Sequence, residues 1–388
     1  MLNENEAFSV MKILYIGPTN QYGGVGHMMF SLCEHIERDS FSFDFLYYMP
    51  PTEAELKRIH KLNGEFFLIP RWSRQPVRFL REIQKFYSAR HYDVVHINAS
   101  SAMLNLYSLP LWKKRNRTCK IVYQSHVDRL GPLSDRILHT LLRPLVIRTA
   151  DKYLAVSEAA AGFMFGKKRV RETVILRNGL DLDRFAFSSV ARTETRKRLN
   201  LENSYVIGTV GRFSPPKNPL FIIRVFEYAC RLDSGAVLLW IGTGEDEDRT
   251  RKLAAELGVA DRVVFYGTTD NVRPFLCAMD CFFFPSRWEG LGIAALEAQM
   301  NGLPVIASDR VPPEAKVTEN YTALSLTDDS MEKWAETLLS FQSEEGDYAR
   351  FSHYEDLLAH GYDIKATAGQ LERIYAEDAY EVRNPDIP

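Results

Sequence analysis

Short runs of apolar residues alternate with amphipathic segments along the whole chain. The apolar runs are four to seven residues long, which fits strands buried on both faces of a sheet. The segments between them, such as 26–36 and 134–149, repeat apolar residues at the spacing of a helix. The predicted strands are 12–16, 42–48, 64–69, 94–97, 120–124, 152–156, 172–176, 206–210, 237–241, 262–266, 281–284, 304–307 and 322–325.

This alternation predicts an α/β protein with two doubly wound, Rossmann-like domains whose parallel sheets carry helices on both faces. The chain has 388 residues, which exceeds what one hydrophobic core usually serves. We place the domain boundary after residue 187, so that residues 1–187 form an N-terminal domain and 188–363 a C-terminal domain. Ligands of such sheets bind at the carboxyl ends of the strands, and two facing edges would form a central cleft.

The stretch 285–298 carries the most specific signal for a ligand. A strand runs into a turn formed by Gly290, Leu291 and Gly292, and a helix follows. Glycines let the backbone approach a ligand, and the first N–H groups of a helix attract phosphate. Glu289 and Glu297 stand eight residues apart, so they could hold hydroxyls on the two sides of a diphosphate, one on a sugar and one on a ribose. The alternative is a helix that carries two solvated glutamates.

A second signal follows the strand 206–210. Arg212 and Lys217 lie in a proline-containing turn at a strand's carboxyl end, where they could face a diphosphate. A departing diphosphate needs such positive charge in the transition state. The alternative is two exposed cations in a loop.

The first strand is followed by a glycine loop, 17–26, that contains Gly23 and Gly24 and could contact a phosphate or a sugar. It lacks the G-x-G-x-x-G spacing, and the second strand ends without an acidic residue, so a nicotinamide enzyme is disfavoured. A tight turn without a ligand remains the alternative. His96 and His126 each follow a strand-like run, and a lone histidine of this kind is usually a core residue.

The charge is divided unevenly between the two halves. Residues 1–187 hold 27 Lys and Arg against 18 Asp and Glu, whereas 188–388 hold 21 against 32. Part of the basic excess alternates with apolar residues between 71 and 86, a pattern that could lie on an anionic membrane surface. A solvated helix face is the equally supported alternative. The cluster comprises Arg71, Arg74, Arg78, Arg81 and Lys85, and no nucleic-acid motif accompanies it, so we expect no nucleic-acid partner.

Other features narrow the class of protein. No apolar run approaches the roughly 18 residues that span a bilayer, and the N-terminus lacks a secretory signal, so we expect a cytoplasmic protein, either free or peripheral on the inner face of the membrane. The five cysteines fit no zinc or redox spacing. Asp-x-Asp at 181–183 and the acidic run 245–248 fit a capped turn and a helix start better than a cation site. We therefore predict no metal.

Taken together, these motifs resemble the retaining glycosyltransferases of family 4, which have the GT-B fold, and the likeness extends from residue 11 to about 376. The resemblance rests on the Gly-Gly loop after the first strand, a histidine at a strand end, an Asn-Gly before the interdomain connection, a basic pair and an E-x7-E motif. In this sequence they are Gly23 and Gly24, His126, Asn178 and Gly179, Arg212 and Lys217, and Glu289 and Glu297.

The resemblance implies roles for these residues. Glu289 would contact the donor sugar, Glu297 the ribose hydroxyls, and Arg212 with Lys217 the diphosphate. The backbone at Asn271 and Val272 would contact the base. His126 would lie by the sugar ring, and the last helix, about 364–376 within the terminal segment 364–388, would pack back on the first domain.

The expected reaction is metal-independent, retaining transfer of a hexosyl unit from a nucleotide diphosphate sugar to a hydroxyl of a glycan acceptor. The expected donor is a UDP-sugar, which acts as a co-substrate, and no cofactor is expected. The expected acceptor is a glycan or a lipid-linked glycan, and the expected setting is bacterial exopolysaccharide or capsule synthesis. The alternatives are a GT-B nucleotide-sugar epimerase or hydrolase and a noncatalytic nucleotide-sugar binding subunit.

The sequence departs from the family pattern in two places. Asn218 and Pro219 follow Lys217 where family members often have glycine. The stretch Val311-Pro312-Pro313-Glu314 replaces the usual Gly-Gly-x-Pro-Glu turn. The second departure leaves the identity of the donor sugar open.

Overall fold

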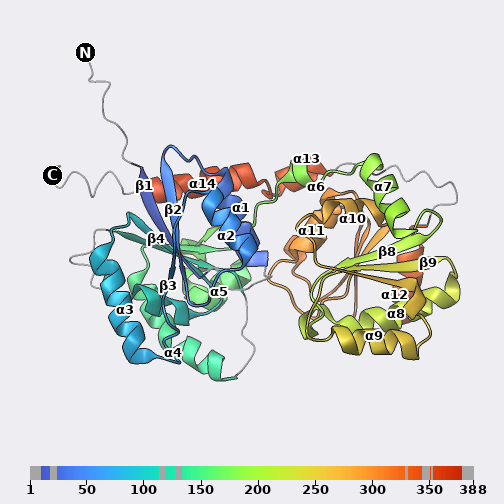
Figure 1. Ribbon diagram of the computed structural model, residues 1–388, viewed down its shortest axis with the longest axis horizontal. Coiled ribbons are helices and arrows are strands. Elements are labelled where there is room, and N and C mark those ends of the chain that lie inside the picture. The colour runs from blue at the N-terminus through green and yellow to red at the C-terminus, as the bar shows by residue number, and fades with distance from the viewer. Residues whose placement is uncertain are drawn as a thin grey trace, which may run out of the picture. The chain divides into compact units, whose positions relative to one another are not determined.

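The computed structural model describes residues 10–17, 24–112, 119–127, 133–327, 331–342, 350 and 353–377. The chain forms two compact units (Figure 1). Unit 1 comprises Met1–Gly179 and Asp363–Pro388, and unit 2 comprises Leu180–Tyr362. The division therefore falls at Gly179, whereas the sequence interpretation placed it after residue 187.

Unit 1 is built on a parallel sheet of seven strands in the order β3-β2-β1-β4-β5-β6-β7. Its strands are β1 (Met11–Ile16), β2 (Phe41–Tyr47), β3 (Phe66–Leu68), β4 (Val94–Ala99), β5 (Lys120–Ser125), β6 (Lys152–Ala155) and β7 (Val174–Ile175). Its α-helices are α1 (Gly24–His35), α2 (Glu53–Lys61), α3 (Pro76–Ala89), α4 (Leu133–Thr149), α5 (Glu158–Phe165) and α14 (Ile364–Ala376).

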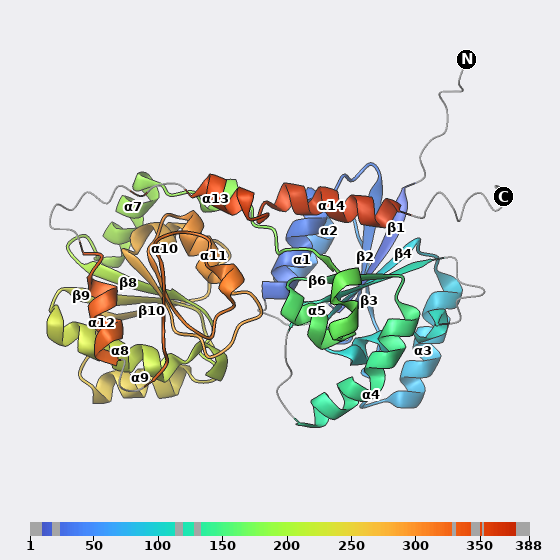
Figure 2. The same ribbon diagram turned by 180° about the vertical axis from the view of Figure 1, so that it is seen from behind.

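Helices cover both faces of this sheet, as Figures 1 and 2 show from opposite sides. One hydrophobic cluster joins the sheet to α1, α2 and α14, and a second joins it to α3, α4 and α5. All six residues of β4 are buried, including the polar His96 and Asn98, so both faces of this central strand are covered. Because both faces of the sheet are apolar, helices pack on each side of it and the unit has three layers.

Helix α14, the last helix described, packs against α1 in unit 1. The hydroxyl of its Tyr375 lies 2.7 Å from the hydroxyl of Tyr15 on β1 and 2.6 Å from Nδ1 of His96 on β4. All three side chains are buried. His96 is thus a hydrogen-bonded core residue, as its position after an apolar run predicts, and α14 completes the polar centre of the first sheet.

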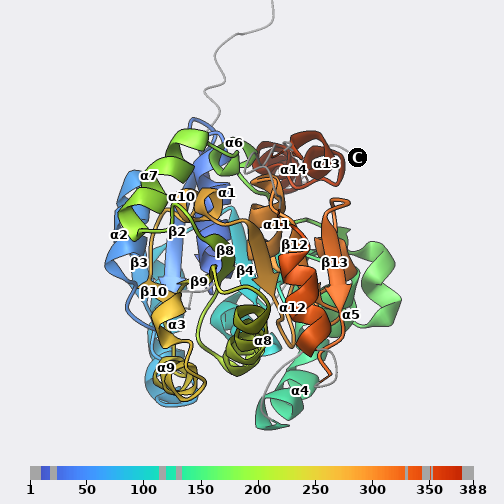
Figure 3. The same cartoon turned by 90° about the vertical axis from the view of Figure 1, so that its right-hand side faces the viewer.

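Unit 2 is built on a parallel sheet of six strands in the order β10-β9-β8-β11-β12-β13. Its strands are β8 (Tyr205–Val210), β9 (Ala236–Ile241), β10 (Val263–Gly267), β11 (Cys281–Phe284), β12 (Val305–Ser308) and β13 (Tyr321–Leu324). Its α-helices are α6 (Leu182–Phe185), α7 (Ser189–Leu199), α8 (Pro219–Leu232), α9 (Glu247–Glu256), α10 (Arg273–Ala278), α11 (Ile293–Met300), α12 (Met331–Leu339) and α13 (Tyr354–Ala359). Figure 3 shows α7, α10 and α11 on one face of the sheet and α8, α9 and α12 on the other.

Both sheets reverse their winding direction near the middle. In unit 2 the central neighbours are β8 and β11, and the chain continues from β8 to β9 on one side and from β11 to β12 on the other. In unit 1 the corresponding pair is β1 and β4. Loops diverge at the carboxyl end of such a pair and leave room for a ligand. The predicted fold class, two doubly wound domains with parallel sheets, is confirmed.

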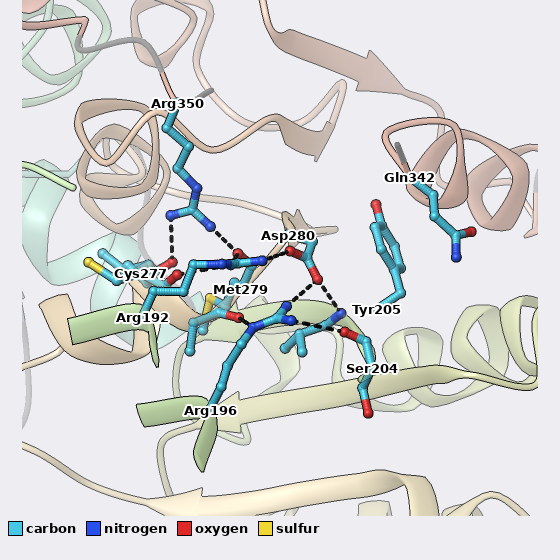
Figure 4. Close-up of polar contacts among 12 residues, drawn as sticks. Arg192, Arg196, Ser204, Tyr205, Cys277, Met279, Asp280, Gln342 and Arg350 are labelled. Carbon is cyan, nitrogen blue, oxygen red and sulfur yellow. Dashed lines mark hydrogen bonds and ion pairs between the residues drawn. The ribbon is translucent and has the colours of Figure 1, made fainter. Parts of the chain in front are cut away.

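A cluster of charged residues lies at the amino edge of the unit 2 sheet, opposite to the carboxyl ends of its strands (Figure 4). Asp280, directly before β11, accepts hydrogen bonds from Arg192 and Arg196 of α7 at 2.5 Å each and from the backbone N–H of Val206 at 2.7 Å. Arg350 donates to the carbonyl of Met279 from the other side. The cluster thereby joins α7 and the segment at residue 350 to the starts of the two central strands.

Candidate functional site

The loops after β8 and β11 are joined by an ion pair at the carboxyl edge of the unit 2 sheet. Nζ of Lys217 lies 2.5 Å from Oε1 of Glu289, and the two side chains are 24% and 13% exposed. The same ammonium lies 4.7 Å from the ring centroid of Phe284, the last residue of β11. A cation held between a carboxylate and an aromatic face has a fixed position, so the structure brings two of the predicted residues together at the switch point.

Local conformation explains how Lys217 reaches this place. Asn218 has φ of +59°, the left-handed region that asparagine tolerates better than most residues other than glycine. Its amide donates to the carbonyl of Pro285 at 3.3 Å and accepts from Nε of Arg287 at 3.1 Å. The departure from the family's glycine is therefore compatible with the same backbone turn, and the asparagine side chain additionally ties the two loops together.

Arg212 lies elsewhere on the same edge. Its guanidinium is 3.3 Å from the carboxylate of Glu245 in the loop after β9, and both side chains are more than half exposed. Gly244 packs so close to Phe213 that a Cβ there would lie 2.5 Å from the Phe213 carbonyl oxygen. The structure pairs Arg212 with a carboxylate of the acidic run 245–248.

The glycine turn leads into α11. Gly292 is the N-cap residue of this helix, has φ of +87°, and makes no side-chain capping bond. A Cβ at Gly292 would lie 3.2 Å from both Phe284 and Val311. Leu291 is buried at 4% exposure and anchors the turn, whereas Gly290 is partly buried. The helix begins with the positive end of its dipole and with unpaired N–H groups next to the Lys217 and Glu289 loops.

Glu297 lies in the second turn of α11 and is partly buried. Burial raises the pKa of its carboxyl to about 7, and the positive charges of Arg184 and Lys217 offset part of this effect. Among the residues that the structure describes, none forms a hydrogen bond with this carboxylate. A half-buried acceptor between two cations suits a ligand's hydroxyl groups.

Arg184, on α6, is a residue that sequence reasoning missed. Its guanidinium donates to the carbonyl of Asp270 at 2.9 Å, while its charge also acts on Glu297. The signal in the sequence was its place directly after the acidic turn 181–183. That turn was interpreted correctly as a cap, because the Asp181 side chain accepts from the N–H of Arg184 at 3.2 Å.

The residues expected to meet the base lie at the end of β10. Asn271 is exposed, its N–H donates to the hydroxyl of Thr269 at 3.1 Å, and Val272 is the N-cap residue of α10. Arg184 donates to the carbonyl of the neighbouring Asp270, and its charge also lowers the pKa of Glu297. The loop therefore belongs to the same carboxyl edge, and a contact of its backbone with a base stays a prediction.

In unit 1, the residues predicted by resemblance are only partly described. Gly23 lies outside the described residues, and Gly24 begins α1 after β1. His126 is buried after β5, and its Nε2 lies 2.8 Å from Oδ1 of Asn98. Burial lowers the pKa of His126 to about 4, so the ring is neutral and Nε2 carries the proton donated to Asn98.

The sequence predicts neither a metal site nor a membrane-spanning helix, and the described part of the chain can be searched for both. There, no three His, Cys, Asp or Glu side chains gather in a way that could hold a metal ion. Nor does any described helix combine the length and apolar character that crossing a membrane requires. Metal independence stays a prediction.

Two family models match the chain. The model of glycosyl transferases group 1 matches residues 191–356, and that of glycosyltransferase family 4 matches 22–184. EpsF of Bacillus subtilis (strain 168), which is named as a glycosyltransferase, is 26% identical over 95% of this chain and 97% of its own length.

Two further similarities concern part of the sequence and the fold. The GDP-mannose-dependent alpha-(1-6)-phosphatidylinositol monomannoside mannosyltransferase of Mycobacterium tuberculosis (strain CDC 1551 / Oshkosh) is 34% identical over 41% of this chain and 44% of its own length. The crystal structure of Anabaena HepE in complex with UDP-glucose superposes with a TM-score of 0.76 at 18% identity, over 94% of this chain and 99% of that one.

These matches span both units and agree with the doubly wound sheets and with the motifs at their carboxyl edges. The chain belongs to the family 4 glycosyltransferases of the GT-B fold.

Proposed function

We propose that the protein transfers a hexosyl unit from a nucleotide diphosphate sugar to a hydroxyl of a glycan acceptor, with retention of the anomeric configuration and without a metal. The observation that carries the proposal is the pair of Lys217 and Glu289, 2.5 Å apart at the switch point of the unit 2 sheet. The pair places a cation for a diphosphate beside a carboxylate for a sugar hydroxyl.

Each part of the donor has a matching group. Lys217, Arg212 and the N-terminus of α11 provide positive charge for the diphosphate. For Arg212 this requires release from Glu245, an exposed pair of the kind that contributes at most about 1 kcal/mol. The Glu297 carboxylate accepts the ribose hydroxyls, and the backbone at Asn271 and Val272 meets the base.

The reaction then breaks the bond between the anomeric carbon and the diphosphate oxygen, and the electron pair leaves with the diphosphate. The acceptor hydroxyl forms the new bond on the same face and gives its proton to the departing diphosphate oxygen. Lys217 stabilises the charge that develops there, and Glu289 holds Lys217 and orients the sugar. Glu289 is not required to act as a nucleophile. The role that the resemblance gives to His126 stays a prediction.

A UDP-sugar is the proposed donor, and exopolysaccharide or capsule synthesis is the proposed setting. The relatives described above differ in this respect, because the mycobacterial enzyme is named for GDP-mannose and HepE was crystallised with UDP-glucose. The base must therefore be decided by experiment.

A thermal-shift panel of nucleotides and nucleotide sugars tests the donor. A ligand at 100 times its dissociation constant stabilises the folded state by about 2.7 kcal/mol. We expect a shift with the diphosphate of one base, weakened in Glu297→Ala and unchanged in Glu256→Ala, whose side chain is exposed on α9. No shift with any nucleotide would contradict the proposal.

Product analysis with the donor so identified separates the remaining alternatives. Products that form at the full rate without an acceptor would indicate an epimerase or hydrolase. Tight nucleotide binding without turnover on any acceptor would indicate a binding subunit.

The proposed location is the cytoplasm, with α3 on an anionic membrane surface. This helix buries Phe79, Ile83 and Phe86, whereas its outer face exposes Val77 at 81% and Leu80 at 51% next to basic residues. Exposed apolar groups beside cations fit the boundary of an anionic bilayer.

Vesicle sedimentation tests this location. Charge reversal at Arg81 and Lys85 should abolish binding to vesicles that contain anionic lipid. Reversal at Lys167 and Lys168, exposed in unit 1 outside this helix, should have a smaller effect. Equal binding by all three proteins would contradict the membrane proposal.

A further inference from the structure

Unit 1 contains a cavity at the carboxyl edge of its sheet, lined in part by the basic cluster between residues 71 and 85. The cavity has a volume of about 670 Å³ and lies between the ends of β2 and β3 and the first turns of α3. Its lining includes Tyr48, Leu68, Arg71, Arg74 and Arg78. The carboxyl edge of a doubly wound sheet is where ligands bind.

The lining of the cavity is strongly positive, because the described carboxylates do not neutralise its arginines. Within the described ranges, none of Arg71, Arg74 and Arg78 forms an ion pair with a carboxylate. Arg71 lies over the ring of Tyr48, at 4.8 Å from its centroid, and Arg78 donates to the amide oxygen of Gln75 at 3.2 Å. Glu82, which also lines the cavity, is already paired with Arg81 at 3.2 Å.

A ligand that balances this surplus needs more than one negative charge. A carboxylate carries a single charge, whereas a phosphate monoester carries about −1.5 to −2 at pH 7 and a guanidinium binds it through two parallel hydrogen bonds. The N-cap residue of α3, Gln75, makes no side-chain capping bond, so the positive helix end adds to the same field. The rim contains Leu68, which is 51% exposed.

We infer that this cavity binds the phosphate or diphosphate group of the glycosyl acceptor. The inference rests on the proposed function, because it names the class of acceptor for that reaction. A phosphate of this kind could belong to a lipid-linked glycan or to a soluble phosphorylated glycan. An apolar chain next to the phosphate would find Leu68 at the rim.

Calorimetric titration with inorganic pyrophosphate and with geranyl diphosphate tests the inference. Saturating nucleoside diphosphate, of the base found in the thermal-shift panel, keeps the unit 2 site occupied. The cavity variant carries Arg74→Gln and Arg78→Gln, both exposed residues whose replacement leaves the core unchanged. The control variant carries Lys167→Gln and Lys168→Gln, which remove the same charge from unit 1 outside the cavity.

We expect geranyl diphosphate to bind the wild type and the control variant equally, and the cavity variant at least tenfold more weakly. Tighter binding of geranyl diphosphate than of pyrophosphate would assign the phosphate to a lipid-linked acceptor, and equal binding to a soluble one. Absence of binding, or the same loss in both variants, would overturn the inference. The thermal-shift panel with nucleotides reports separately on the proposed function, because it does not depend on the cavity.

Discussion

Both edges of the unit 2 sheet carry ion pairs between basic and acidic side chains. The two edges differ in how many hydrogen bonds their carboxylates accept. At the amino edge, Asp280 is almost completely buried and satisfied by two arginines and a backbone N–H. At the carboxyl edge, Lys217 and Glu289 form a single ion pair, and Glu297 lacks a hydrogen-bond partner among the described residues. A closed network stabilises the fold, whereas an open one keeps donors and acceptors available for a ligand.

Replacement of Asp280 should produce the largest effect on stability. Asp280→Asn leaves Arg192 and Arg196 with no carboxylate, and breaking a buried ion pair from one side costs about 3–5 kcal/mol. We expect this loss in the free energy of unfolding by urea, with unchanged nucleotide affinity of the folded fraction. Glu256→Gln, at an exposed pair with Lys252, should change stability by less than about 0.5 kcal/mol. A loss below 1 kcal/mol in Asp280→Asn would remove the distinction between the edges.

Replacement of Lys217 should lower activity strongly and stability less than replacement of Asp280 does. Lys217→Met removes the cation expected at the departing diphosphate, and loss of one such group lowers kcat about 10²–10³-fold. The loss of unfolding free energy should be smaller than in Asp280→Asn, because Lys217 and Glu289 form one ion pair, whereas Asp280 is held by two arginines and a backbone N–H. Steady-state kinetics and urea unfolding measure the two quantities, with Lys252→Met as the control. Full activity would contradict the role of the carboxyl edge.

Gly292 should affect both stability and ligand binding, because it is the N-cap residue of α11 and lies at the proposed diphosphate site. Gly292→Ala places a side chain in the left-handed region, at about 1–2 kcal/mol, and brings its Cβ to 3.2 Å from Phe284 and Val311. Gly258→Ala is the matched control, because Gly258 has φ of +71° and no atom within 4 Å of the added Cβ. We expect a similar backbone cost in both variants but weaker nucleotide binding only in Gly292→Ala. Unchanged nucleotide affinity in Gly292→Ala would argue against a ligand at this helix end.

The smallest expected effect concerns pH. The pKa of Glu297 is raised to about 7, so its carboxylate becomes available as pH rises through 7. Affinity for a nucleotide sugar, which has no titrating phosphate in this range, should increase up to about tenfold between pH 6 and pH 8.

Two variants test the origin of this pH dependence. Glu297→Gln should bind with no such dependence. Arg184→Met should move the midpoint to higher pH, because Arg184 lowers the pKa of Glu297. A wild-type profile that matches Glu297→Gln would exclude Glu297 from binding.

The sequence predicted the strands of both sheets because buried strands are short, continuous apolar runs, and β11 has the predicted bounds 281–284. It also predicted the pair of Lys217 and Glu289 as members of one site. The partner of Arg212 could not be predicted, since Glu245 looks like an ordinary acidic residue before a helix. The Asp280 cluster was missed for a related reason. The two arginine partners of Asp280 lie more than 80 residues away in the chain, and only the folded arrangement brings them together.

Helix α14 delays completion of unit 1 until the last part of the chain has been synthesised. The first sheet buries Tyr15 and His96 against Tyr375, so its polar centre stays incomplete until that residue has left the ribosome. Unit 2, by contrast, is one continuous stretch and can fold as soon as it has been synthesised. The half of the protein that is translated first is therefore the half that matures last.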